Sequence, residues 1–483
     1  MHIAEYLDQD ATGIAELVRS GAVSPTEPAQ CALALAEKLN PVIGAFAEFY
    51  PERATADFIN RASHGPFWGV PFAIKDAVAH EDGQVMEMGS RLCAGLRAPG
   101  DTDLALRFKT AGLINLGRTK VPEFAFNIST EALLYGPAHN PWRQGYSTGG
   151  SSGGAAAAVA ARILPIAHAN DGGGSIRIPA SCCGVVGLKP TRGRVPIGPE
   201  AGEGLGGLGI EHVVTRSVRD TAAALDWVAG PGVGDPYEIA QPEERYANVI
   251  TRDPARLKIA LWQVAPNGDA IDPRVAAALA RVASQCEALG HDVEVVTPDI
   301  GLSWDAFMLA NAQMWCVHIA HWVEALEAVT GRKATLDTVE RTSLACVDYG
   351  RTMSGLDVMH AEDSFNIVSR AIGRLMTGYD LILSPTMPFL PHAHGVYDAN
   401  AEGLDGLGWT AKIFKGSPFT PLFNVTGLPA ISLPLGHDET EDLPIGIQFG
   451  AGFGREDRLL GIAAQLERAM PWAGRRPTLP YGI

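Results

Sequence analysis

The chain of 483 residues lacks a long apolar run and an excess of positive charge. The longest apolar stretch near the motifs described below, Ala155 to Ala161, ends at Arg162, far short of the roughly 20 residues that cross a bilayer. Lys and Arg number 38 against 54 Asp and Glu, a formal net charge of −16. Nucleic acid and anionic membrane are therefore not expected as partners, since both need a basic face. The acidic balance predicts a soluble protein with a solvated surface.

Cysteine is also scarce, and the seven that occur show no paired spacing. An odd, unpatterned set is typical of reduced thiols and predicts a cytoplasmic protein. The opening MHIAEYLDQDATG has early acidic residues and no apolar core, so it is not expected to be a signal peptide.

Motifs for phosphate, dinucleotide and metal binding are missing or incomplete. No GxxxxGK[ST] segment occurs. The glycines of GEGLGG (202–207) have dinucleotide-type spacing, but they follow VPIGPEA and lead into an extended segment instead of a helix. His318 with His321, and His392 with His394, lack a further ligand at zinc-like spacing. We expect neither a cofactor nor a metal.

Helix and strand patterns alternate along the chain. Helix starts are expected at Ser24-Pro25, after Asp101-Thr102, and at Ser217, where Asp220 completes a capping pattern. Short apolar runs predict strands at 70–74, 113–119, 163–170, 258–264, 292–298, 380–385, 430–435 and 445–451. This alternation predicts an α/β fold with a central mixed β-sheet covered by helices on both faces.

No feature of the sequence divides the chain into separate domains. The best linker candidate is 230–246, but strand patterns resume after it. We expect one domain over 1–483, with a helical N-terminal segment (1–65), a core that carries the motifs below (66–235), a helix-rich elaboration that shapes the substrate site (303–377) and a C-terminal part of the core (378–483).

Three separated segments each offer a group suited to acyl transfer. Lys75 follows the apolar run VPFAI, Ser151 lies in GGSSGG, and Ser175 follows three glycines in NDGGGSIR. A serine hydroxyl needs an acceptor for its proton, and a lysine accepts one only when it is neutral, which burial favours. Glycine amides can approach a ligand closely, as an oxyanion hole requires.

This set of motifs resembles the amidase signature family of serine hydrolases. Lys75 and Ser151 are 76 residues apart, and Ser151 and Ser175 are 24 apart, both close to what the family uses. The resemblance runs from SPTEPAQCALA near the start to PIGIQFGAGFGREDRLL near the end. HANDGGGSIRIPASCCG and GPAHNPW are similar to the branch that includes 6-aminohexanoate cyclic-dimer hydrolases. Gly172 stands where other branches commonly have Thr or Ile, a change expected to leave more room and to alter the mechanism little.

The resemblance implies the amidase-signature fold and a cofactor-independent amide hydrolase that works through an acyl-enzyme. Ser175 would attack the carbonyl carbon, and Ser151, joined to Gly150 by a cis peptide bond, would relay the proton to neutral Lys75. The backbone amides of Gly172, Gly173, Gly174 and Ser175 would form the oxyanion hole.

Two charged residues beside the nucleophile have expected structural roles. Asp171 is expected to orient backbone amides, because Lys75 already supplies the proton acceptor. Arg177 is expected to be a structural tie and not a clamp for a substrate carboxylate.

The expected substrate pocket is apolar. Phe124 and Phe126 lie before the serine motifs, and Met314, Trp315 and Cys316 lie in NAQMWCVHIAHW. Nylon-type relatives place a cysteine in the substrate cavity at a comparable point, so the resemblance implies that Cys316 binds substrate and is not a nucleophile. Phe124 is also expected to bind substrate, as part of the apolar neighbourhood of the pocket. Such a pocket favours neutral amides, linear or cyclic, because burying a charge without a partner is costly.

Three alternatives stay open. The same triad serves carbamate (urethane) or aryl ester hydrolysis. The glutamine-dependent amidotransferase subunit of the family works with partner subunits, but Ile178 replaces the Gln typical of that branch. A catalytically silent binding protein is disfavoured by the intact triad. The expected partner is a small amide or carbamate, and the sequence leaves open whether the chain forms a homodimer.

Overall fold

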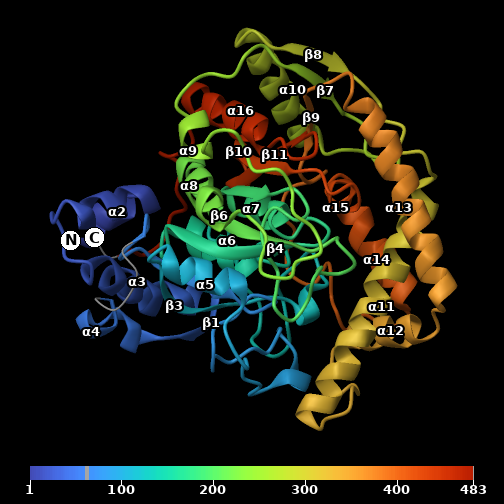
Figure 1. The fold of residues 1–483 in the computed structure, drawn as a ribbon, viewed down its shortest axis with the longest axis horizontal. Coiled ribbons are helices and arrows are strands. Elements are labelled where there is room, and N and C mark those ends of the chain that lie inside the picture. The colour runs from blue at the N-terminus through green and yellow to red at the C-terminus, as the bar shows by residue number, and fades with distance from the viewer. Residues whose placement is uncertain (60–64, 482–483) are drawn as a thin grey trace.

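The computed structural model describes residues 1–59 and 65–481, and a large mixed sheet lies at its centre (Figure 1). The strand order is β4-β6-β5-β10-β11-β9-β7-β8. Neighbours are antiparallel from β4 to β9, whereas β9, β7 and β8 are parallel. The strands are β4 (Ile166–Asp171), β5 (Val186–Lys189), β6 (Ile210–Thr215), β7 (Lys258–Leu261), β8 (Asp292–Val295), β9 (Leu381–Pro385), β10 (Ala430–Asp438) and β11 (Leu443–Ala451). The predicted mixed sheet is confirmed.

A second sheet, of three strands, was not expected, and it carries Lys75. Its order is β1-β3-β2, with β1 (Phe46–Phe49) antiparallel to β3 (Ile114–Thr119), and β2 (Pro71–Lys75) parallel to β3. The backbone amide of Lys75 donates to Nδ1 of His168 on β4, at 3.2 Å. The end of β2 therefore lies against a strand of the large sheet.

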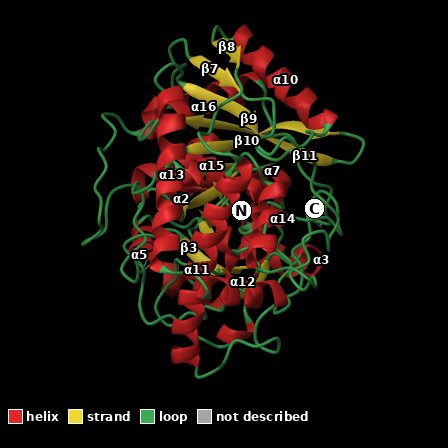
Figure 2. Cartoon of the chain, turned by 90° about the vertical axis from the view of Figure 1, so that its right-hand side faces the viewer, coloured by secondary structure: helices red, strands yellow, loops and turns green. Residues whose placement is uncertain are grey.

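Helices cover both sheets (Figure 2). In the first half they are α1 (Ile3–Asp8), α2 (Ala11–Arg19), α3 (Glu27–Ile43), α4 (Ala56–Ile59), α5 (Asp103–Thr110), α6 (Gly153–Ala160), α7 (Arg177–Cys183) and α8 (Val218–Val228). In the second half they are α9 (Tyr246–Val249), α10 (Pro273–Ala288), α11 (Trp304–Thr330), α12 (Arg341–Arg351), α13 (Gly355–Leu375), α14 (Gly406–Gly416), α15 (Pro421–Val425) and α16 (Glu456–Ala469). Short 3₁₀ helices are η1 (Pro51–Ala54), η2 (Arg91–Cys93) and η3 (Glu123–Ala125).

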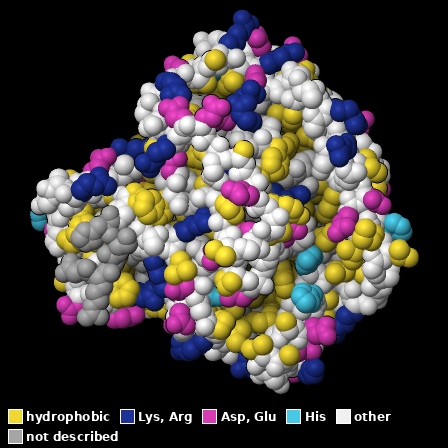
Figure 3. Space-filling view, in the orientation of Figure 1, with side chains coloured by type: hydrophobic (Ala, Val, Ile, Leu, Met, Phe, Trp, Pro, Cys, Tyr) yellow, Lys and Arg dark blue, Asp and Glu magenta, His cyan; other side chains and the backbone are white. Residues whose placement is uncertain are grey.

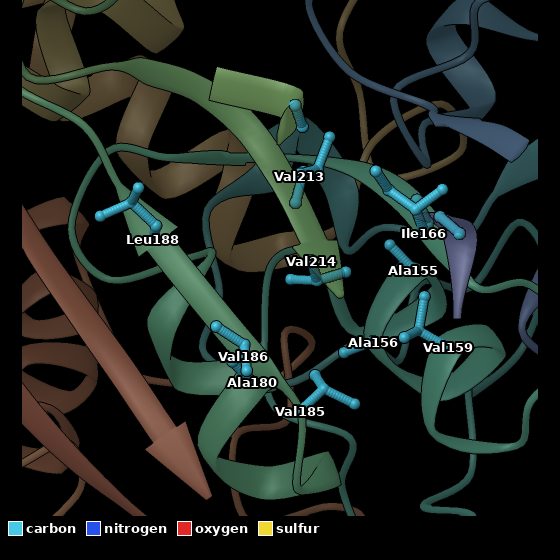
Figure 4. Close-up of a cluster of buried hydrophobic side chains, with 14 of the residues drawn as sticks. Ala155, Ala156, Val159, Ile166, Ala180, Val185, Val186, Leu188, Val213 and Val214 are labelled. Atoms are coloured by element: carbon cyan, nitrogen blue, oxygen red, sulfur yellow. The ribbon is translucent and has the colours of Figure 1, made fainter. Parts of the chain in front are cut away.

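Helix α6, which follows the Ser151 segment, is fully buried. Its sequence, GGAAAAVA, has small side chains that allow close packing, and every residue is buried. Figure 4 shows Ala155, Ala156 and Val159 of α6 in one apolar cluster with Ile166 of β4 and with Val213 and Val214 of β6. The residues just before α6 are thereby held in the interior.

The segment 303–377 forms the long helices α11, α12 and α13, as its helix-rich pattern predicted. These helices lie together along one side of the molecule, beside α14 (Figure 1). Their apolar side chains belong to a second core cluster, which also includes Phe126, Trp262 and Phe414. This layer reaches the loop between β4 and α7, residues 172–176, which carries the predicted nucleophile Ser175 and is called the nucleophile loop.

Most expected element boundaries are close to those observed. Thr102 caps α5 through Ala105 N, and Ser217 caps α8 through Asp220 N. The expected helix start at Ser24 is wrong, because α3 begins at Glu27 after the N-cap Thr26. The strands β1 and β5 were not predicted from the sequence, whereas β6 coincides with the segment after GEGLGG that was expected to be extended.

The surface carries both signs of charge. Figure 3 shows Lys and Arg side chains interspersed with Asp and Glu on the face in view, without a large patch of one sign. Among the described residues, no helix combines the length and the apolar character needed to cross a membrane.

Candidate active site

The side chain of Lys75 lies at the end of β2 and is fully buried. Its Nζ lies 2.7 Å from Ser151 Oγ and 2.9 Å from Ser152 Oγ. It also forms a hydrogen bond with Oδ1 of Asn170, near the end of β4. Of these contacts, sequence analysis predicted only the one with Ser151.

The electrostatic surroundings of Lys75 favour its neutral form. Burial lowers the pKa of Lys75 from its usual 10.5 to about 7, although the negative charges of Glu211 and Asp171 act in the opposite direction. A substantial fraction of Lys75 is therefore uncharged at neutral pH, as a proton acceptor must be.

The neighbouring polar groups define how a neutral Lys75 uses its hydrogen-bonding capacity. Asn170 Nδ2 donates to the carbonyl of Ala77 at 3.0 Å, so Oδ1 is the atom that faces Lys75. Ser152 Oγ donates to the carbonyl of Asn170 at 3.2 Å, so its oxygen is left to accept. A neutral amine has two N–H groups and one lone pair. The N–H groups are taken by Ser152 and Asn170, and the lone pair is left for the hydroxyl proton of Ser151.

The two serines and Lys75 are graded in exposure. Lys75 is 0% exposed, Ser151 1% and Ser175 8%. The peptide bond between Gly150 and Ser151 is cis, as the family resemblance implied. The backbone amide of Ser152 donates to the carbonyl of Ser175 at 3.3 Å, which joins the two serine segments. Ser175 is thus the member of the triad nearest to solvent, and Lys75 the deepest.

The loop that carries Ser175 connects β4 to α7 and is organised by Asp171. The carboxylate of Asp171 accepts from Gly174 N at 2.7 Å and from Ile176 N at 3.2 Å. Gly174 has a φ of +136°, which L side chains rarely adopt. The Gly174 amide is therefore engaged with Asp171, so it is not free to donate to an oxyanion. The predicted oxyanion hole loses one of its four donors. Within residues 1–59 and 65–481, the amides of Gly172, Gly173 and Ser175 make no hydrogen bond to protein groups.

Asp171 is held ionised by Arg177. Burial alone would raise the pKa of Asp171, but the charge and hydrogen bonds of Arg177, together with Asn424, lower it to about 2. Arg177 Nε lies 2.8 Å from Asp171 Oδ2, and its Nη1 lies 2.8 Å from Gln448 Oε1. Both charged side chains are fully buried. Asp171 is thus suited to orienting amides and not to acid catalysis, and Arg177 is not free to bind a substrate carboxylate.

Aromatic side chains line the nucleophile loop. The rings of Phe126 and Trp315 stack, with centroids 4.4 Å apart and planes inclined by 13°. A Cβ atom placed on Gly172 would lie 2.9 Å from Cζ2 and Cη2 of Trp315, and one on Gly173 would lie 3.6 Å from Phe414. The space beside Gly172, which we expected to be open, is therefore filled by Trp315.

Phe124 and Cys316 were also expected in the pocket. Phe124 is buried within η3, with an unusual φ of +51°. Cys316 is fully buried, and a Cβ atom on Gly406 of α14 would lie 2.9 Å from its sulfur. Helix α11 thus turns Trp315, not Cys316, towards the nucleophile loop. The substrate-binding roles of Phe124 and Cys316 stay predictions, and the contacts of Cys316 do not favour its role.

Two polar residues beside Lys75 were missed by sequence analysis. Ser152 directly follows Ser151, and Asn170 directly precedes Asp171, so adjacency to the motifs was the only available signal. The segment GEGLGG (202–207), whose glycine spacing is of the dinucleotide-binding type, precedes the strand β6 and opens no helix.

Comparisons with known proteins agree over nearly the whole chain. The model of the amidase family matches residues 29–460. A 6-aminohexanoate-cyclic-dimer hydrolase from Paenarthrobacter ureafaciens is 40% identical over 481 residues, which cover 98% of this chain and 97% of that protein. A solved structure of 6-aminohexanoate cyclic dimer hydrolase has a TM-score of 0.93 at 38% identity, covering 98% of this chain and 99% of that one. A bacterial aryl acylamidase of the amidase signature family has a TM-score of 0.87 at 26% identity, covering 97% and 99%.

Proposed function

The chain belongs to the amidase signature family, and from that premise we propose that it hydrolyses a neutral, largely apolar small amide, linear or cyclic, through an acyl-enzyme on Ser175. As a member of this family it is a hydrolase that acts on C–N bonds. The proposal adds the substrate class and the roles of individual residues. The observation that carries it is the buried, 2.7 Å contact between Lys75 Nζ and Ser151 Oγ.

Acylation begins at Ser175. Its Oγ attacks the carbonyl carbon of the substrate, while its proton passes to Ser151 and the proton of Ser151 passes to Lys75. The carbonyl oxygen becomes an oxyanion, which accepts hydrogen bonds from the amides of Gly172, Gly173 and Ser175. Lys75 is now an ammonium, stabilised by the acceptors Ser152 and Asn170.

Collapse of the tetrahedral intermediate breaks the C–N bond. The proton on Lys75 returns through Ser151 to the nitrogen, which leaves as an amine, and Lys75 is neutral again. Water then attacks the ester on Ser175 and gives its proton to the same relay. The relay returns that proton to Ser175 Oγ as the carboxylic acid leaves.

The preference for uncharged amides rests on what surrounds the loop. The side chains of Phe126, Trp315 and Phe414 are aromatic, uncharged and buried, and Arg177 is committed to Asp171. A charged acyl group would lose hydration there without gaining a partner. Relatives named as 6-aminohexanoate-cyclic-dimer hydrolases support cyclic or oligomeric amides as substrates.

The proposal is tested with Ser175→Ala and a fluorophosphonate probe that labels activated serines. Wild-type protein should be labelled at Ser175 and should hydrolyse neutral amides in a panel of amides, carbamates and aryl esters followed by mass spectrometry. Ser175→Ala should fold, lose labelling and lose turnover. Ser369→Ala, on α13, is the matched control and should keep both. Labelling at another serine in Ser175→Ala would contradict the nucleophile assignment. Faster turnover of carbamates or aryl esters than of every amide would contradict the substrate class.

A further inference from the structure

Trp315 has a buried polar group, the indole N–H, that no described residue of the chain accepts from. Its indole lies between the ring of Phe126 and the glycines of the nucleophile loop. The residue is only 5% exposed, and within the described part of the chain its Nε1 has no hydrogen-bond partner. An unpaired buried N–H lowers the stability of the protein, and a phenylalanine would avoid that cost.

The indole that carries the unpaired N–H borders Gly172, three residues before Ser175. Cζ2, which would lie 2.9 Å from a Cβ atom placed on Gly172, is separated from Nε1 by one ring atom. Nε1 therefore lies two bonds from the atom of the indole that meets Gly172. Trp409, another buried tryptophan of the second core, differs in this respect, because its Nε1 donates to the carbonyl of Phe126 at 3.2 Å.

The chemistry of an indole restricts what can pair with this N–H. Indole N–H is a donor only, so its partner must be an acceptor. In the proposed mechanism, the oxygen of the scissile carbonyl already accepts hydrogen bonds from the amides of Gly172, Gly173 and Ser175. The acceptor must also be uncharged, because Arg177 and Lys75 are both engaged elsewhere.

We propose that Trp315 Nε1 donates a hydrogen bond to a second carbonyl of the substrate, outside the scissile bond, and so makes the enzyme selective for diamides and oligoamides over monoamides. This inference rests on the function proposed above. Trp315 is a specificity-determining residue in this scheme and takes no part in proton transfer.

Gly172 helps to set the position of the Trp315 ring, because it leaves room for that ring. Any side chain at position 172 would have its Cβ within 2.9 Å of the Trp315 ring and would displace it. Gly172→Ala should therefore disturb the same preference for diamides without removing the indole.

The test compares two cyclic amides of equal ring size, one with two amide groups and one with a single amide. Trp315→Phe keeps an aromatic ring and removes the N–H. Its kcat/KM for the diamide should fall about tenfold more than its kcat/KM for the monoamide, a difference typical of one hydrogen bond. Fluorophosphonate labelling of Ser175 should keep its wild-type rate. Trp472→Phe, a tryptophan whose Nε1 donates to the carbonyl of Arg216, is the control and should leave the ratio of the two values unchanged.

Equal losses for both amides in Trp315→Phe, or no loss for either, would overturn the inference and leave the proposed function standing. If Trp315→Phe does not fold, Gly172→Ala decides, and an unchanged diamide-to-monoamide ratio in that variant would likewise overturn it. Failure of the wild-type protein to hydrolyse either amide while Ser175 is labelled would contradict the proposed function itself.

Discussion

Lys75 is a residue whose chemistry follows from its burial. Because only the neutral amine accepts a proton, activity should fall as pH drops through the pKa of about 7. We expect kcat/KM for a neutral amide to drop about tenfold per pH unit below that value and to level off above about pH 8. A pH profile with chemistry shown to limit the rate checks this. A flat profile from acid to alkaline pH would contradict a titrating lysine.

Asn170 offers a second test of the same site, because Asn170→Asp changes charge with little change in shape. A carboxylate beside Lys75 Nζ should raise the pKa of the lysine by about 1–3 units. The pH of half-maximal kcat/KM should therefore move in the alkaline direction. The control is Asn311→Asp. Asn311 is also buried but lies on α11, so this substitution should leave the pH of half-maximal kcat/KM unchanged. An unshifted midpoint in a folded Asn170→Asp protein would show that Asn170 does not face the base.

At the scale of single elements, α6 holds the serine segment by close packing. Ala156 is fully buried between α6 and the large sheet (Figure 4). Ala156→Leu adds volume that the cluster cannot accommodate, and overpacking of this kind costs about 1–3 kcal/mol. We expect a lower melting temperature and slower fluorophosphonate labelling of Ser175. Ala277→Leu, exposed on α10, should change neither. Unchanged stability in Ala156→Leu would contradict tight packing of α6.

Elements with a clear local pattern could be predicted from the sequence. The strands β2, β3, β9 and β11 are short apolar runs, and Ser217 caps α8 as its spacing with Asp220 indicates. The strand β5 carries Lys189, a charged residue that only the folded interior accommodates, and β1 is only four residues long. Their pairing with distant strands decides their state, and no local signal records it.

In the active site, too, some residues could be predicted from local motifs and others could not. Lys75, Ser151 and Ser175 belong to recognisable motifs, whereas Asn170 reaches Lys75 across 95 residues of chain. The choice between Trp315 and Cys316 depends on the rotation of α11. Adjacent residues of an α-helix point about 100° apart, so a sequence motif cannot say which of the two faces the loop. That orientation comes from packing of α11 against α12 and α14.

At the scale of the whole molecule, we propose that the chain unfolds as one unit. The large sheet is shared by both apolar clusters, because Leu381 and Leu383 of β9 point into the first and Ile382 into the second. Loss of either cluster would expose one face of the same strands. Urea unfolding followed by far-UV circular dichroism and by tryptophan fluorescence should therefore give coincident transitions. Fluorescence changes that precede loss of secondary structure would indicate that the α11–α14 layer unfolds separately.

The difference in exposure among Lys75, Ser151 and Ser175 determines where the amine leaves and where water enters the site. Lys75 and Ser151 are sealed inside, so in the proposed mechanism both the departing amine and the incoming water use the approach at Ser175. The amine must vacate this approach before water can attack, and any other amine admitted first would capture the acyl group and form a new amide. Under the proposed mechanism, the product would therefore depend on which nucleophile reaches the acyl-enzyme first, and amines would compete with water.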